Sequence, residues 1–296
     1  MVPLADESAL LGLGTLVDAG GLIPADARGP LLATLAGYAA TARGLGAERI
    51  AFVGTEPLRR AADARSVVVA VEAATGVPLH VVDHREEGLL TLLGATSGRA
   101  VEADLLVVDI GGGSTQLVLV GPGRRADATG IGVGGARLTA AHVRHDPPTE
   151  SEIRELRSAA AAAIAAGPAA VAAGPAAAPT AIVAVGGTAS NLVKVVPGAL
   201  EDRLVTLDRL VEALAVLRSA PADEVAARCG IRPQRARILA AGAALLEAIL
   251  ERYGVPRATA SEEGIREGTV LALARAGAAW RDRLELLAHG WGTAEA

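Results

Sequence analysis

The segment VVDIGGGSTQL, residues 107–117, places one carboxylate, three consecutive glycines and two hydroxyls between two apolar runs. Because glycine has no Cβ, the backbone N–H groups of such a turn can approach an anion closely and converge on a phosphate-sized group. Ser114 and Thr115 add hydroxyl donors, and Asp109 can hold Mg²⁺ directly or through water. The alternative is a tight hairpin whose glycines only allow positive φ. The carboxylate directly before the glycines favours a phosphate site.

A second glycine turn, GGTAS at residues 186–190, also follows an apolar run. Alone it is weak evidence, because many strands end in a glycine turn. Two such loops in one chain predict two phosphate-facing turns on opposite sides of a cleft. That arrangement is found in actin-like ATPases and sugar kinases, where two related domains face each other.

Charged residues begin two of the expected helices. Glu86 and Glu87 start one, where the helix dipole favours carboxylates. Under one interpretation both are first-turn acids with no further role. Under the other, one of the two carboxylates points at a bound phosphate and acts as a general base for water. Arg59 and Arg60 lie in the first turns of an earlier helix. Either guanidinium can hold phosphate oxygens bidentately, or both lie on a solvated helix face.

The elements that must position these residues alternate between strands and helices, which predicts the α/β class. A hairpin is expected around GGGS, and Thr149 and Glu152 have the spacing of a capping box. We expect a domain boundary near residue 92, which gives domains 1–92 and 93–296. Strands are expected at 48–54, 79–83, 104–110, 115–120 and 181–187, and helices at 23–45, 57–75, 86–95, 207–219, 233–253 and 265–288.

Composition excludes several classes of protein. The 296-residue chain is 51% hydrophobic and carries a net charge of −5 without a basic block, so no nucleic-acid surface is expected. The single cysteine, Cys229, excludes an internal disulfide and fits a reducing cytoplasm. The first residues lack the pattern of a signal peptide. Residues 158–193 are uncharged, but Gly-Pro pairs interrupt them, so no membrane span is expected.

Four segments, in this order, resemble the exopolyphosphatase and guanosine pentaphosphate phosphohydrolase (Ppx/GppA) family. GTEPLRRAAD is similar to its Thr-x-x-Leu-Arg-x-Ala segment, and REEGLL to its Glu-Glu-Ala-Arg-Leu segment. VVDIGGGSTQL resembles its Asp-Ile-Gly-Gly-Gly-Ser-Thr-Glu loop, and VGGTASNL its Gly-Gly-Thr-Ala loop. The resemblance extends from about residue 9 to about residue 275.

The resemblance implies a two-domain actin-like ATPase (ribonuclease H-like) fold, a homodimer and a Mg²⁺ cofactor. It implies removal of the terminal phosphate of inorganic polyphosphate, or of the 5′ phosphate of pppGpp, so that polyphosphate or a guanosine penta- or tetraphosphate is the partner. Glu87 falls on the general base and Asp109 on the acidic residue of the glycine loop, and both are the implied metal ligands. The implied phosphate-binding residues are Arg59, Gly111, Gly112, Gly113, Ser114, Thr115, Gly186, Gly187 and Thr188.

The chain departs from the family pattern at three places. No Asp-x-Gly-Ser-Asn-Ser loop, the family's first phosphate loop, precedes LGLGTLVDAGG. Either the start of the chain is placed too far downstream, or the N-terminal domain is truncated. Gln116 stands where the family has Glu, and Gly88 and Leu89 replace Ala-Arg. These departures motivate a second hypothesis, a non-catalytic sensor of polyphosphate or an alarmone. A small-molecule kinase of the same superfold is a third.

Overall fold

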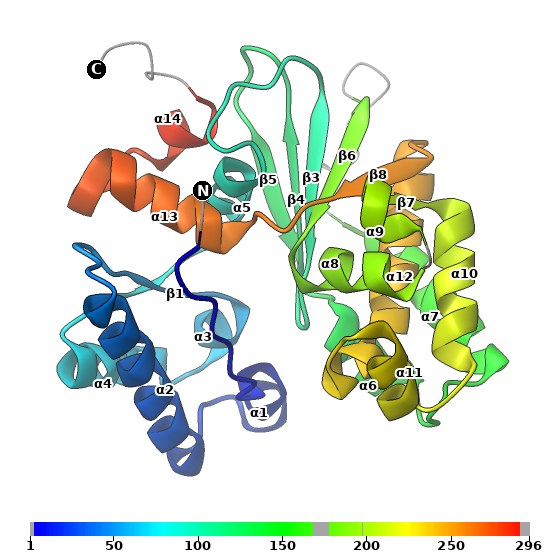
Figure 1. Ribbon diagram of the computed structural model, residues 1–296, viewed down its shortest axis with the longest axis horizontal. Coiled ribbons are helices and arrows are strands. Elements are labelled where there is room, and N and C mark those ends of the chain that lie inside the picture. Colours follow the sequence, from blue (N-terminus) through cyan, green and yellow to red (C-terminus); the bar gives the residue numbers. More distant parts are fainter. Residues whose placement is uncertain (1–2, 168–177, 197, 291–296) are drawn as a thin grey trace. The chain divides into compact units, whose positions relative to one another are not determined.

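The contacts of the chain divide it into two compact units, seen in a computed structural model (Figure 1). Residues 84–95, which include the helix expected over 86–95, group with the second unit, and the domain boundary near residue 92 stays a prediction. The structure describes residues 3–167, 178–196 and 198–290. The first unit comprises residues 1–83 and 273–280, and the second comprises 84–272 and 281–296.

The described residues 3–83 of the first unit form a two-stranded parallel sheet and four α-helices, and residues 273–280 add the end of another helix and a 3₁₀ turn. Strand β1 (Phe52–Gly54) pairs with β2 (Leu79–Val81), so both lie where strands were expected, although they are shorter. The unit is closed by a small apolar core that includes Val17, Ile23 and Val71. Its helices are α1 (Leu13–Gly20), α2 (Ala25–Gly44), α3 (Glu56–Arg60) and α4 (Ala64–Thr75).

The prediction of a single helix over 57–75 is wrong, because the helical conformation is interrupted between α3 and α4. Ala61 adopts an extended backbone conformation with φ −67° and ψ 125°. Asp63 accepts hydrogen bonds from the Ile23 N–H (3.0 Å) and from Arg28 Nη2 (2.6 Å). These long-range contacts stabilise the non-helical segment between α3 and α4, and helical periodicity alone does not reveal them.

The second unit is built on a six-stranded mixed sheet in the order β5-β4-β3-β6-β8-β7. β3 and β4 form the expected hairpin around the triple glycine, with Asp109 opposite Gln116. β6 pairs in parallel with both β3 and β8, while β5 and β7 are antiparallel edge strands. The strands are β3 (Leu105–Ile110), β4 (Thr115–Val120), β5 (Asp127–Ile131), β6 (Ala181–Val185), β7 (Leu204–Thr206) and β8 (Arg257–Ala260).

Helices cover this sheet and complete its core. The longest, α12, is rich in alanine, and its buried side chains pack with α7 and α6. Thr149 and Glu152 form the expected capping box at the start of α7. The helices are α5 (His84–Ala95), α6 (Gly135–His142), α7 (Glu150–Ala165), α8 (Gly186–Val195), α9 (Ala199–Asp202), α10 (Leu207–Arg218), α11 (Ala222–Cys229), α12 (Pro233–Tyr253), α13 (Ile265–Ala276) and α14 (Leu284–Ala288). The last four residues of α13 group with the first unit.

The prediction of one continuous helix over 265–288 is wrong, because helix α13 is shorter. It ends at Ala276, where Gly277 has φ +57°, a left-handed value that an α-helix cannot continue through. A short 3₁₀ turn at Gly277–Ala279 follows, and α14 starts at Leu284.

Side-chain alternation along β3 assigns its residues to two faces. Leu106, Val108 and Ile110 join the large apolar core formed with α7 and α12. Val107 and Asp109 therefore point to the opposite face. Helix α5 packs against β3, β4 and β5 of the same unit. This alternation brings Asp109 to the side of the sheet on which α5 supplies Glu87.

Within the described residues, no helix is long and apolar enough to cross a membrane. The uncharged segment 158–193 instead contains the end of α7, strand β6 and most of α8. Residues 168–177 of that segment lie outside the described part of the chain.

Candidate phosphate-binding site

The two glycine loops lie side by side on one sheet. β3 and β6 are adjacent parallel strands with Asp109 opposite Val185, so their carboxyl ends, and the loops that follow, are at the same sheet edge. The expectation that these loops face each other from two domains is therefore wrong. Both belong to the second unit. Sequence could not decide this, because it does not say which strands pair.

The triple-glycine loop is a tight turn whose carbonyls are bound by helix α6. The Gly111 N–H donates to the Ser114 carbonyl (2.9 Å), which closes the turn. The carbonyls of Gly111 and Gly112 accept hydrogen bonds from the first N–H groups of α6, those of Gly135 and Ala136, both at 2.9 Å. These contacts fix the loop and occupy its acceptors.

The donors of this loop remain available to a ligand. Among the described residues, the N–H groups of Gly112, Gly113 and Ser114 have no hydrogen-bond acceptor. The Gly113 carbonyl accepts from Arg137 Nη1 at 2.7 Å, which keeps that oxygen away from an incoming anion. Three consecutive N–H groups with their carbonyls bound elsewhere are the arrangement of an anion-binding nest.

Close packing explains a further glycine that sequence reasoning did not assign. A Cβ on Gly134 would lie 2.5 Å from the Gly111 carbonyl oxygen. Only glycine therefore lets the start of α6 approach the loop this closely. The signal in the sequence was the pair Gly134–Gly135, which follows the β5 strand.

Hydroxyls expected to bind phosphate mostly hold the loops together. Thr115 Oγ1 donates to the Val133 carbonyl and Thr188 Oγ1 to the Ile110 carbonyl, both at 2.7 Å. The Thr188 bond connects α8 to the end of β3. Ser114 is buried, and its Oγ accepts a hydrogen bond from Gln116 Nε2 at 3.0 Å. The phosphate-binding roles of these three residues stay predictions.

Gln116 has a defined place in the hairpin. It is 1% exposed and lies opposite Asp109 on β4. Its amide donates to Ser114, which a carboxylate at this position cannot do because ionised carboxylates only accept hydrogen bonds. The departure from the family's Glu therefore places a hydrogen-bond donor beside Ser114, whose Oγ accepts.

Two carboxylates form the acidic part of the site. Glu87 is buried in the first turn of α5, and Asp109 is the penultimate residue of β3. Burial, and after it the neighbouring Glu87 carboxylate, raise the pKa of Asp109 to about 7, although Arg235 opposes both effects. Because two like charges share this site, ionising both is costly unless a cation is bound. This is the carboxylate pair that the sequence predicted, and the structure brings the two residues together.

Arg235, in the first turn of α12, is a site residue that sequence reasoning missed. It is exposed and acts electrostatically on Asp109. A Cβ on Gly187 would lie 3.1 Å from Arg235 Nη1, so the guanidinium rests against the second glycine loop. Gly186 is equally restricted: it has φ +77°, and a Cβ there would lie 2.5 Å from Asp109 Oδ1. The glycines bring Asp109 and Arg235 against the start of α8.

Arg59 belongs to the first unit and is described there by itself. It lies in α3, and its Nη1 donates to the Val82 carbonyl at 2.9 Å. Arg60 pairs with Glu56 and with Asp18, both at 2.6 Å. The expected role of Arg59 in holding a phosphate chain stays a prediction.

The residues present fit a weakly held magnesium ion. No cluster of three or more His, Cys, Asp or Glu side chains suited to a metal occurs in the described ranges. Mg²⁺ usually keeps several waters and takes one or two carboxylates together with substrate phosphates. Glu87 and Asp109 meet that requirement, and both the burial of Asp109 and the Glu87 charge beside it raise the pKa of Asp109.

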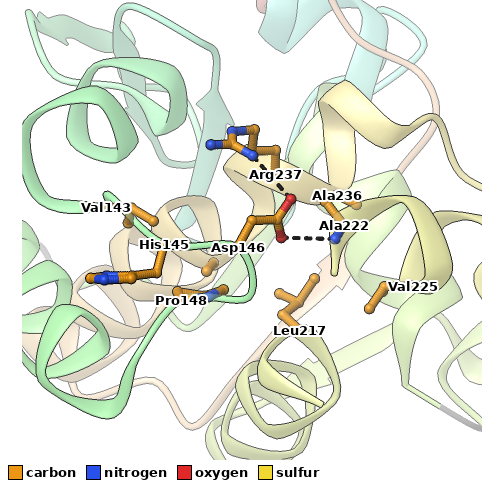
Figure 2. A pocket seen from close by; sticks show the side chains of 10 residues that line it. Val143, His145, Asp146, Pro148, Leu217, Ala222, Val225, Ala236 and Arg237 are labelled. Atoms are coloured by element: carbon orange, nitrogen blue, oxygen red, sulfur yellow. Dashed lines mark hydrogen bonds and ion pairs between the residues drawn. The ribbon is translucent and has the colours of Figure 1, made fainter. Parts of the chain in front are cut away.

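A small pocket elsewhere in the second unit contains none of these residues (Figure 2). Asp146 lies at its centre, where it accepts from the Ala222 N–H (2.8 Å) and pairs with Arg237 (3.0 Å). Asp146 thereby connects the segment before α7 to the starts of α11 and α12. Most of the remaining lining is apolar, including Val143, Leu217 and Val225. These contacts have a structural role, so we place the site at the glycine loops.

The fold is that of the actin-like ATPase class, and the glycine loops are its candidate site for phosphate. The chain belongs to the Ppx/GppA phosphatase family, whose model matches residues 1–276. This confirms the family and the fold expected from the four segments.

Individual relatives agree with the family match. Exopolyphosphatase 2 of Mycobacterium tuberculosis is 29% identical over 285 residues, which cover 90% of this chain and 88% of that protein. The guanosine-5′-triphosphate,3′-diphosphate pyrophosphatase of Vibrio cholerae is 26% identical, over 76% of this chain and 44% of the other. The Ppx/GppA crystal structure from Aquifex aeolicus has a TM-score of 0.72 and 25% identity, and covers 90% of this chain and 87% of that one.

Proposed function

We propose that this protein hydrolyses the terminal phosphoanhydride bond of inorganic polyphosphate, or the bond to the 5′ terminal phosphate of pppGpp. The observation that carries the proposal is the Glu87–Asp109 pair at the edge where both glycine loops begin. A terminal phosphate needs donors for its oxygens, positive charge nearby and a base for water. The loop N–H groups, Arg235 and Glu87 provide these three functions.

The proposed mechanism is direct transfer of the phosphoryl group to water. Glu87 accepts a proton from a water whose oxygen attacks the terminal phosphorus, and the bond to the bridging oxygen breaks. The N–H groups of Gly112, Gly113 and Ser114 donate to the nonbridging oxygens, where they stabilise the developing charge. Asp109 and Glu87 would hold Mg²⁺, which supplies positive charge to the phosphate oxygens when bound.

The activity test compares the wild-type protein with Glu87→Gln. Phosphate release from long-chain polyphosphate and from pppGpp is measured with Mg²⁺, and Glu212→Gln on the exposed face of α10 is the matched control. Loss of a positioned base lowers rates by about 10²–10⁴-fold, so Glu87→Gln should be nearly inactive while the control is unchanged. The ratio of the two rates shows which substrate is preferred. Equal turnover by wild type and Glu87→Gln contradicts the mechanism.

The buried Gln116 amide favours one second candidate, a non-catalytic sensor of the same ligands. A neutral amide stands where the family has a carboxylate, and this amide donates a hydrogen bond to Ser114. If polyphosphate raises the melting temperature and no phosphate is released, the sensor is the correct function. The homodimer implied by the family and the cytoplasmic location expected from the single cysteine stay predictions.

A further inference from the structure

The region that matches the family model ends at residue 276. The segment that follows it packs against α5, the helix that carries Glu87. We propose that residues 281–289, here called the C-terminal clasp, position α5 and thereby the general base. The proposal rests on the proposed function. It assigns Arg281, Glu285 and His289 as positioning residues.

Two ion pairs connect the clasp to α5. Arg281 binds Glu86 bidentately, with 2.6 Å between Nη2 and Oε2, and Arg85 Nε donates to Glu285 Oε1 at 2.7 Å. Arg85 and Glu86 are consecutive, and they immediately precede Glu87. Each segment carries one arginine and one glutamate. A shift of either segment that exchanged these partners would place like charges together. The pairs therefore fix the register of α5 against the clasp.

His289 anchors the other end of the clasp to the sheet. Its Nε2 accepts from the Ala126 N–H, and its Nδ1 lies 2.6 Å from the Glu285 carbonyl. A backbone N–H can only donate and a carbonyl can only accept, so Nε2 is the acceptor and Nδ1 the donor of these two contacts. Arg85 Nη1 donates to the carbonyl of the same Ala126 at 3.3 Å. Ala126, which directly precedes β5, is thus hydrogen-bonded to both the clasp and α5.

The clasp also packs by apolar contact. Leu284 and Leu287 of α14 are buried, and α14 lies beside α5 within the second unit (Figure 1). On its other side α5 approaches the sheet so closely that a Cβ on Gly88 would lie 2.9 Å from Val118 Cγ2. The first turn of α5 is therefore held between the sheet and the clasp. Glu87 occupies that turn, so its orientation depends on both contacts.

The test is Arg281→Met, which removes the charge and keeps much of the side-chain length. Its matched control is Arg124→Met, which removes an ion pair of similar exposure, between the loop that follows β4 and Asp104, directly before β3. We expect kcat of Arg281→Met to fall about tenfold with KM within about twofold, because the base is misplaced while the phosphate loops are unchanged. Arg281→Lys should recover most of kcat. Equal kcat for Arg281→Met and Arg124→Met would overturn the proposal.

Hydrogen exchange separates this proposal from the proposed function. If the wild-type protein releases no phosphate, the proposed function fails, and the exchange of α5 amides decides about the clasp. Faster exchange of the first two turns of α5 in Arg281→Met, with unchanged exchange in Arg124→Met, supports the clasp. Identical exchange of α5 in both variants overturns it.

Discussion

Replacing Asp109 with Asn should stabilise the protein at alkaline pH while removing its activity. The pKa of Asp109 rises from 3.8 to about 7 because of burial and the Glu87 carboxylate. The folded state therefore holds a proton that the unfolded state has released, and stability falls as the pH rises from about 4 to about 7. Asparagine occupies nearly the same volume, and it carries no charge to desolvate.

The expected gain follows from the size of this shift. A pKa moved from 3.8 to about 7 corresponds to a cost on the order of 4 kcal/mol for ionising Asp109 above pH 7. Asp109 is only partly buried, so solvent screening reduces the net gain to about 2 kcal/mol. Asp109→Asn should be more stable than wild type by this amount at pH 8, and nearly equal to it at pH 4.5.

The assay is urea unfolding at pH 4.5 and pH 8 without divalent cations, followed by far-ultraviolet circular dichroism. Glu212→Gln, on the exposed face of α10, serves as the control and should change little at either pH. With Mg²⁺ at pH 8, the wild type should regain stability and Asp109→Asn should not, because only the carboxylate pair binds the cation. The reasoning is refuted if Asp109→Asn gains nothing at pH 8, or gains the same amount at both pH values.

Two further predictions concern the loops and the start of α7. Gly186→Ala should destabilise the protein by about 1–3 kcal/mol and impair phosphate release, because the residue has φ +77° and its Cβ would meet Asp109 Oδ1 at 2.5 Å. Gly230→Ala, at φ +63° with open space around it, should cost only the backbone strain of about 1 kcal/mol, so equal losses in urea unfolding would contradict the steric argument. Burial raises the pKa of Glu152, but hydrogen bonds from Thr149, Arg144 and His145 outweigh it and lower the pKa to about 2. Its stabilisation is present above pH 4.5 and lost as the pH falls toward 2, so Glu152→Gln should reduce stability by about 2 kcal/mol at pH 7 and much less at pH 2. A constant difference between the two proteins across an acid titration would show that the carboxylate charge is not what stabilises α7.

Sequence alone determined the local features whose causes lie within a few residues. The capping box at Thr149 and Glu152, the hairpin around the triple glycine and the bounds of α12 all follow from short-range spacing and turn chemistry. The order of the four motifs was also sufficient to predict the family, and the family model confirms it. Glu87 and Asp109 were predicted as a pair, and the structure brings them together.

Tertiary structure decided which segments meet. The parallel pairing of β3 with β6 places both glycine loops on one sheet, although their similarity had suggested two facing domains. Arg235 reaches the site from α12, more than forty residues after the second loop, and no local pattern signals that contact. The clasp is a further example, because Arg281 and Glu86 are 195 residues apart. Such contacts depend on how elements pack, and periodicity along the chain carries no information about packing partners.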